Sequence, residues 1–227
     1  MTNMKYLKPA ALGSALALLS VAHAGIVVDD FNDPTGGLTV NLDNPPGAGT
    51  ASASTVAAGI LGGQRDLAFN VAYTAPTTAS VQVNEPTSPS RLTESSGDFA
   101  TPDLTLNYNA NGAGLGVSLS AASLTLKDLH TDLPLTVNVW LTTSAGNSYT
   151  ATVPVAGGYG ADLTISSFST VGAPTLSDIN DIKVEFIGQA GADYSLNTIT
   201  AVPEPSAYGG LAALGLLGTV VWRRARA

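Results

Sequence analysis

Hard oxygen ligands crowd into a short acidic segment near residue 30 of the chain. Within five positions the sequence places Asp29, Asp30, Asn32 and Asp33. A calcium ion takes six to eight such ligands, so the segment predicts a structural Ca²⁺ site at Asp29, Asp30 and Asp33. Asp193 would complete the site if the last strand of a β-sandwich meets the first. The spacing lacks the frame of an EF-hand loop, and turn residues that cap their own backbone are the alternative interpretation.

Arg65 is a second candidate, because residues 25–202 hold only four basic side chains. It stands at the start of an otherwise apolar strand pattern. One interpretation is a clamp for a ligand or a carboxylate, since guanidinium groups bind carboxylates through two parallel hydrogen bonds. The other is a structural ion pair with a nearby aspartate such as Asp66 or Asp30.

Catalytic groups are scarce. His130 is the only histidine after residue 24, and no Gly-x-Ser-x-Gly motif accompanies it, so a serine triad would have to use the segment 129–132. Glycoside hydrolysis needs two carboxylates, yet Glu85 and Glu94 fall in a region that reads as loop, and Glu185 reads as a solvent-facing strand residue. The sequence therefore predicts no catalytic residue, and a polysaccharide hydrolase is kept as the competing hypothesis.

Composition excludes several classes of site. The chain has no cysteine, which removes disulfides, thiolate chemistry and cysteine-ligated metals, and it has neither a histidine pair for zinc nor a phosphate-binding glycine loop. Residues 25–202 carry 16 acidic and four basic side chains, a net charge of 4 − 16 = −12, which argues against nucleic acid as a partner. Aromatic rings that would either stack on a sugar or fill the core are Tyr73, Tyr108, Trp140, Tyr149, Tyr159 and Tyr194.

The sequence predicts short strands as the elements that position the acidic, basic and aromatic candidates. Apolar and polar residues alternate with period two, the pattern of half-buried strands, over 64–73, 104–108, 135–141, 149–155 and 182–187. We expect 135–141 to pair with 149–155, 104–108 to form a hairpin with 115–119, and a closing strand over 194–201. Residues 43–63 and the ten or so after 85–89 read as loops, the former with one weak strand at 50–56.

About ten to twelve strands at roughly ten-residue intervals, without a helical period, predict an all-β domain over 25–201. The expected architecture is an antiparallel β-sandwich or jelly roll.

The N-terminus has the three parts of a secretory signal peptide. Lys5 and Lys8 supply positive charge, residues 9–21 are apolar, and Ala22-His23-Ala24 is a small-x-small cleavage site. We expect signal peptidase to remove residues 1–24 and Gly25 to begin the mature chain. An uncleaved anchor is the alternative.

The C-terminus predicts a membrane segment. Residues 207–222 carry no charge, and 16 residues at ~1.5 Å each make a helix of about 24 Å, a little short of a ~30 Å hydrocarbon core. The basic tail 223–227, with Arg223, Arg224 and Arg226, stays on the cytoplasmic side. The body of the protein is then outside the inner membrane.

Pro203-Glu204-Pro205, the short apolar segment and the terminal arginines together resemble the PEP-CTERM sorting signal of Gram-negative, exopolysaccharide-producing bacteria. The resemblance covers 202–227. It implies recognition by an exosortase, cleavage near the Pro-Glu-Pro, and release or transfer of an inner-membrane-anchored precursor to the cell surface or extracellular matrix. An ordinary single-pass tail anchor is the alternative.

A second resemblance lies in the mature domain. The opening strand into Asp29-Asp30-Phe31, the segment 62–66 and the late strand 181–187 look like the galactose-binding-like jelly rolls of exported bacterial proteins. We therefore expect a non-catalytic surface or biofilm-matrix protein that binds polysaccharide or calcium. A purely structural matrix component is a further alternative.

Overall fold

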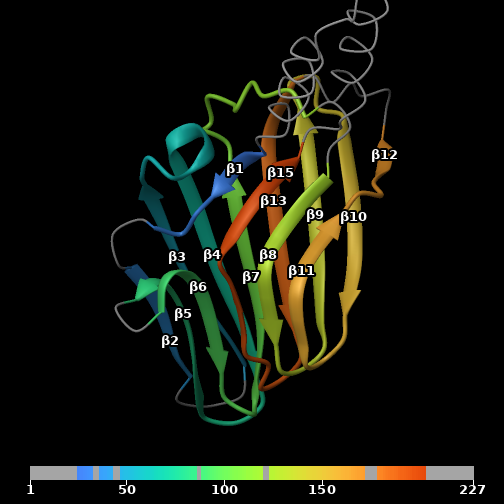
Figure 1. Cartoon of the computed structure of the whole chain (residues 1–227). Coiled ribbons are helices and arrows are strands. Elements are labelled where there is room, and N and C mark those ends of the chain that lie inside the picture. The colour runs from blue at the N-terminus through green and yellow to red at the C-terminus, as the bar shows by residue number, and fades with distance from the viewer. Residues whose placement is uncertain are drawn as a thin grey trace, which may run out of the picture.

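The computed structural model describes residues 25–32, 36–42, 47–85, 88–119, 123–171 and 178–202. The expected signal peptide (1–24), sorting motif (203–205), membrane segment (207–222) and basic tail lie outside these residues. The described chain forms two antiparallel β-sheets that pack face to face (Figure 1). Its only helical element is the 3₁₀ turn η2 (Leu61–Gly63). The all-β sandwich expected from the strand pattern is confirmed.

One sheet has eight strands. Its order is β1 (Ile26–Asp29), β15 (Thr198–Val202), β8 (Ser123–Thr131), β14 (Tyr194–Leu196), β6 (Ser88–Ser96), β5 (Thr77–Glu85) and β2 (Gly36–Leu42), with β11 (Tyr159–Ile165) on the free side of β8. The first strand pairs with the last, Ile26 opposite Ala201, as the sandwich hypothesis required. The closing strand expected over 194–201 is split at Asn197 into β14 and β15.

The other sheet has seven strands. Its order is β12 (Ser169–Val171), β10 (Ser148–Val155), β9 (Leu135–Thr143), β13 (Ile179–Gly188), β7 (Ala100–Tyr108), β4 (Gln64–Tyr73) and β3 (Gly47–Val56). The predicted strand 64–73 and the predicted pairing of β9 with β10 are confirmed. Residues 47–56 form a full ten-residue edge strand, where only a weak strand at 50–56 was expected.

Two sequence expectations were wrong. The hairpin of 104–108 with 115–119 does not form, because β7 pairs with β4 and β13 while Val117 makes only an isolated bridge to Ile179. The expected loop after residue 89 is strand β6. Its inward positions are Leu92, Glu94 and Ser96, and one apolar residue in three gives no period-two pattern.

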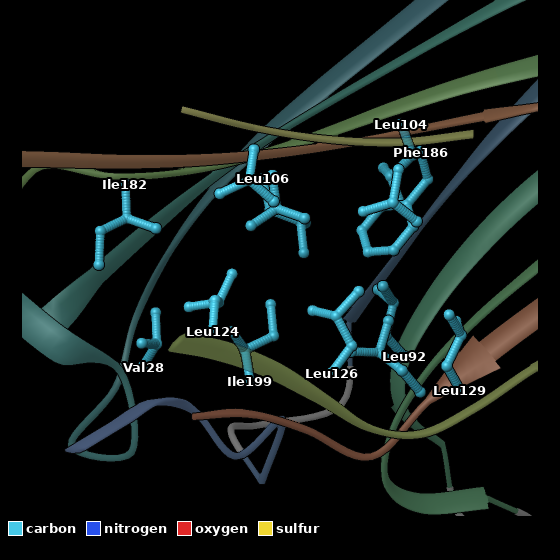
Figure 2. Packing of buried hydrophobic residues seen from close by; sticks show 14 of the residues in the cluster. Val28, Leu92, Leu104, Leu106, Leu124, Leu126, Leu129, Ile182, Phe186 and Ile199 are labelled. Atoms are coloured by element: carbon cyan, nitrogen blue, oxygen red, sulfur yellow. The ribbon is translucent and has the colours of Figure 1, made fainter. Parts of the chain in front are cut away.

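The core lies between the sheets. Figure 2 shows Leu104, Leu106, Ile182 and Phe186 of the seven-stranded sheet facing Val28, Leu92, Leu124, Leu126, Leu129 and Ile199 of the other. Strand β8 keeps its leucines inward through a bulge: Asp128 has φ +52 and the register with β11 shifts between Ala161 and Leu163. The bulge changes the side-chain alternation, so Leu129 and Leu126 both face the core although they are three residues apart.

Among the described residues, no helix has the length and apolar character needed to cross a membrane.

Candidate functional site

Asp29 belongs to a buried ion pair. Its side chain is fully buried, and its Oδ2 accepts hydrogen bonds from Arg65 Nη1 at 2.7 Å and from the Tyr108 hydroxyl at 2.9 Å. Oδ1 accepts the Phe31 amide at 2.9 Å, and the guanidinium lies 5.3 Å from the centre of the Phe31 ring. Burial raises the pKa of Asp29, whereas the Arg65 charge and these hydrogen bonds act to lower it. Arg65 thus has the structural role expected, but its partner is Asp29 rather than Asp30 or Asp66.

This arrangement does not suit calcium at Asp29, because its oxygens already bind a cation and two hydrogen-bond donors. Asp193 does not lie beside Asp29. The strand register places Asp29 at the level of Leu126 of β8, whereas Asp193 is hydrogen-bonded to Asp132, just past the end of β8. At ~3.3 Å per residue, the levels of Leu126 and Asp132 are about 20 Å apart along the strand. Asp30 accepts the Asn32 amide at 3.0 Å. Asp33 lies outside the described residues, in which no group of three acidic, histidine or cysteine side chains is placed to hold a metal ion.

His130 pairs with Asp128 rather than Asp132. Its Nε2 lies 2.7 Å from Asp128 Oδ1. Its Nδ1 lies over Gly160 of β11, on the other side of β8 from Ser195. The imidazole therefore does not activate Ser195, the serine opposite it in register.

The outer face of the seven-stranded sheet gathers a large set of polar side chains. The register aligns two neighbouring rows across six strands, from β3 to β10. One row is Ser54, Asp66, Asn107, Lys183, Trp140 and Thr150; the other is Ser52, Ala68, Thr105, Glu185, Asn138 and Thr152. We call these the outer rows. Hydroxyls, amides, carboxylates and one ammonium thus share one surface, which provides both donors and acceptors.

A hollow of about 390 Å³ lies at the β3–β4–β7 end of the outer rows. The small side chain of Ala68 leaves this space between Ser52 and Thr105, which also line it. Asp66 at its floor is held in place, since Oδ1 accepts Ser54 Oγ at 2.5 Å and Gln64 Nε2 at 2.9 Å.

The centre of the outer rows is also ordered by side-chain contacts. Lys183 Nζ lies 4.3 Å from the centre of the Trp140 ring and 3.4 Å from Glu185 Oε1, while Asn138 Nδ2 donates to Glu185 Oε2 at 2.9 Å. Asn107, with its amide nitrogen toward Asp181, donates to Asp181 Oδ2 at 2.9 Å. At ~4.8 Å per strand, Trp140 lies two strands, about 10 Å, from Asn107.

Two further carboxylates on this face are less acidic than usual. Burial, and then the charge of Glu185, raise the pKa of Asp103, with Lys183 acting in the opposite direction. Burial also raises the pKa of Asp181, against the hydrogen bond from Asn107 and the charge of Lys183. The face is therefore rich in oxygen acceptors beside a single ammonium group.

The expected aromatic candidates divide between core and surface. Tyr108, Tyr149 and Tyr194 are buried, and Tyr194 stacks on Phe186 with ring centres 5.4 Å apart. Trp140 alone among the six lies in the outer rows. Period-two alternation predicted the outward direction of Trp140, but the partners in neighbouring strands depend on register, which the sequence does not state.

Comparison with known proteins identifies the C-terminal segment. Residues 201–226 match the PEP-CTERM protein-sorting motif. The chain therefore carries an exosortase sorting signal, which is the mark of an exported protein sorted at the membrane. No curated protein gives a significant match to the chain.

The solved structures that align with this chain include carbohydrate-binding modules. The family 11 module of the cellulosomal cellulase Lic26A-Cel5E of Clostridium thermocellum aligns over 78% of this chain and 94% of its own, at 10% identity and TM-score 0.37. TmCBM61 in complex with β-1,4-galactotriose aligns over 73% and 99%, at 9% identity and TM-score 0.35. An exo-β-agarase aligns over 80% of this chain but 25% of its own, at 12% identity and TM-score 0.40. At these scores the description of the fold rests on the strand pairing itself.

Proposed function

We propose that this protein is a non-catalytic, exported polysaccharide-binding protein whose binding surface is the outer rows of the seven-stranded sheet. Its signal peptide and C-terminal membrane helix take it to the inner membrane of a Gram-negative cell. An exosortase then processes it for the cell surface or the biofilm matrix.

The outer rows carry this proposal. A sugar chain presents hydroxyl groups that both donate and accept hydrogen bonds, and the rows offer hydroxyls, amides and carboxylates in mixed order over six strands. The hollow beside Asp66 adds a concave element with an ordered acceptor, and Trp140 adds apolar ring surface on the same face.

The test is binding of the purified chain, in detergent, to neutral polysaccharides such as mixed-linkage β-glucan, β-1,4-galactan and xylan, by affinity electrophoresis. Thr105→Trp fills the hollow, and Trp140→Ala removes the ring. Each is expected to weaken binding about tenfold or more, which corresponds to ~1.4 kcal/mol.

Matched controls keep the size of the change but move it elsewhere. Thr170→Trp places the same bulk on the exposed edge strand β12, and Phe99→Ala removes an exposed ring from the 97–100 turn; both should bind like wild type. If Thr105→Trp binds polysaccharide as tightly as wild type, the outer rows are not the binding surface. Release of reducing ends from the bound polymer would contradict the non-catalytic role and favour the hydrolase hypothesis.

Calcium at the acidic segment is a separate proposal that now rests on Asp30 and Asp33, because Asp29 is committed to Arg65. A rise of several degrees in Tm with millimolar calcium, reduced in Asp30→Ala, would support it. An identical Tm with and without calcium would contradict the calcium site and favour the interpretation that the acidic residues cap their own backbone in a turn.

A further inference from the structure

A second polar groove lies on the opposite outer face, that of the eight-stranded sheet. It has a volume of about 490 Å³ and is lined by residues of β6, β14, β8 and the start of β11, together with Asp132, Gly158 and Asp193. Three of the lining residues are buried: Glu94, Thr131 and Tyr194. We call it the β8 groove. None of its lining residues belongs to the outer rows, so the two surfaces are physically separate.

Two hydroxyl side chains, one imidazole and a glycine form the floor of the β8 groove. Thr93, Ser195, His130 and Gly160 are successive neighbours across four strands. Gly160 leaves room for the imidazole: a Cβ there would come within 2.9 Å of His130 Nδ1. The ring can therefore lie over the β11 backbone, and the floor stays open.

A side-chain network on the same outer face lies beside the groove and orders its residues. Arg91 donates to Asn197 Oδ1 through Nε at 2.6 Å, to Ser195 Oγ through Nη1 at 3.1 Å, and to Asp128 through Nη2. Asn197 Nδ2 donates to Asp128 Oδ2 at 2.9 Å, and Asp128 Oδ1 binds His130. Arg91, Asn197 and Asp128 thus fix the positions of Ser195 and His130 without a ligand, which reduces the ordering cost of binding.

This network also fixes which hydrogen-bonding groups face the groove. Ser195 Oγ accepts from Arg91, so its own hydrogen is left to donate. His130 Nε2 faces a carboxylate and must carry a hydrogen, so in the neutral ring Nδ1 is an acceptor. Thr93 adds a hydroxyl to the same floor.

Two carboxylates form one rim. Asp132 Oδ1 accepts the amides of Leu133 at 2.7 Å and Asp193 at 2.8 Å, and Asp193 Oδ1 accepts the Ser96 amide at 2.9 Å. Both side chains are exposed, and in each the second oxygen remains for a ligand hydroxyl. This negative rim repels uronates and sulfated sugars, while a neutral sugar offers hydroxyl donors to it.

We propose that the β8 groove is a second binding site for neutral glycans, so that one domain bridges two polysaccharide chains from its opposite faces. The inference rests on the proposed function for the outer rows. Bridging adds to the retention of a long polymer through effective concentration, without any new contact at either site.

The experiment compares three tryptophan substitutions in the full chain in detergent. Thr93→Trp fills the β8 groove, Thr105→Trp fills the hollow in the outer rows, and Thr170→Trp is the matched control. Calorimetry with neutral hexasaccharides of β-glucan, β-1,4-galactan and xylan gives the stoichiometry, and turbidity with the long polymers reports bridging. Circular dichroism and Tm confirm that each variant is folded, and His130→Ala tests the groove without added bulk.

Wild type and Thr170→Trp are each expected to bind two hexasaccharides. Both should also crosslink and precipitate the long polymer, which is measured as a rise in turbidity. Thr93→Trp and Thr105→Trp are each expected to bind one and to lose bridging, with the long polymer held about tenfold or more less tightly. One site in the wild type, unaffected by Thr93→Trp and lost in Thr105→Trp, overturns this inference and leaves the proposed function standing. If the wild type binds one hexasaccharide and only Thr93→Trp loses that binding, bridging is overturned and the binding surface is the β8 groove rather than the outer rows. No binding of any probe by the wild type overturns both.

Discussion

Two carboxylates are buried between the sheets, and the protein accommodates them differently. Asp29 is fully buried and meets a guanidinium, a phenol and an amide. Glu94 is 2% exposed and receives one hydrogen bond, from Ser96 Oγ to Oε1, while Oε2 has no partner among the described residues. An unpaired buried charge is far more costly than a paired one. Burial raises the pKa of Asp29, and the Arg65 charge and the hydrogen bonds offset part of that rise, whereas Glu94 avoids the cost by keeping its proton.

The pKa of Glu94 expresses this difference. Burial raises it to about 8, with the Ser96 hydrogen bond acting against the rise and the charges of Asp193 and Asp132 adding to it. Near neutral pH the side chain is thus a buried neutral acid. A buried carboxylate in this fold is tolerated either with a full set of partners or with a proton.

The largest effect on the free energy of unfolding is expected from removing the guanidinium group of Arg65. Arg65→Met keeps apolar bulk but leaves Asp29 as a buried charge without its counterion, which costs about 3–5 kcal/mol. Urea unfolding at pH 7 measures the loss. Asp29→Asn/Arg65→Met removes both charges and should recover a large part of it. A loss below about 1 kcal/mol in Arg65→Met would show that the ion pair is not what keeps Asp29 buried.

Glu94→Gln is expected to act in the opposite direction. Between the ordinary pKa of 4.5 and about 8 the folded state holds a proton that the unfolded state has released, so wild-type stability falls as pH rises through that window. The amide does not titrate, so at pH 8 the variant should be more stable than wild type by on the order of a few kcal/mol. Urea unfolding at pH 5, 6.5 and 8 gives the slope. If the free energy of unfolding changes equally with pH in wild type and in Glu94→Gln, Glu94 is not the group whose titration lowers the stability.

The sequence predicted the apolar framework much better than these two sites. Strand 64–73 and the hairpin of β9 with β10 have unbroken period-two alternation, so side-chain chemistry alone predicted the bounds of β4 and placed the ends of β9 and β10 to within two residues. Strand β6 has Leu92 as its only apolar inward residue, and the chain there read as loop. Glu94 was consequently placed in a loop, and the buried acid was missed.

The partners of polar residues were the other failure. A structural ion pair was one of two interpretations of Arg65, but its partner Asp29 lies 36 positions away in the sequence, and no local pattern predicts their contact. The same holds for the outer rows and the β8 groove, whose members come from four or more strands. Alternation predicts which way a side chain points; the neighbours in the next strand are decided by register and by bulges such as that at Asp128.

Tyr108→Phe tests the neutral donor of the paired site. The phenol donates to Asp29 Oδ2 at 2.9 Å, and a hydrogen bond to a charged group contributes about 1.5–3 kcal/mol. The ring and its packing are unchanged, so the loss reports the hydroxyl. Urea unfolding at pH 7 should show it in the wild type and much less in Asp29→Asn/Arg65→Met. The same loss in both backgrounds would separate the hydroxyl from the ion pair.

Ser96→Ala removes the matching donor from Glu94 and is expected to cost least. At pH 6 its acceptor is a neutral acid, so the loss should be about 0.5–1.5 kcal/mol. Because the Ser96 bond lowers the pKa of Glu94, the substitution should raise that pKa further and extend the fall in stability to higher pH. In Glu94→Gln the extension should vanish, since no proton is left to retain. A pH profile of Ser96→Ala that parallels the wild type would mean that the hydroxyl bonds the two protonation states equally.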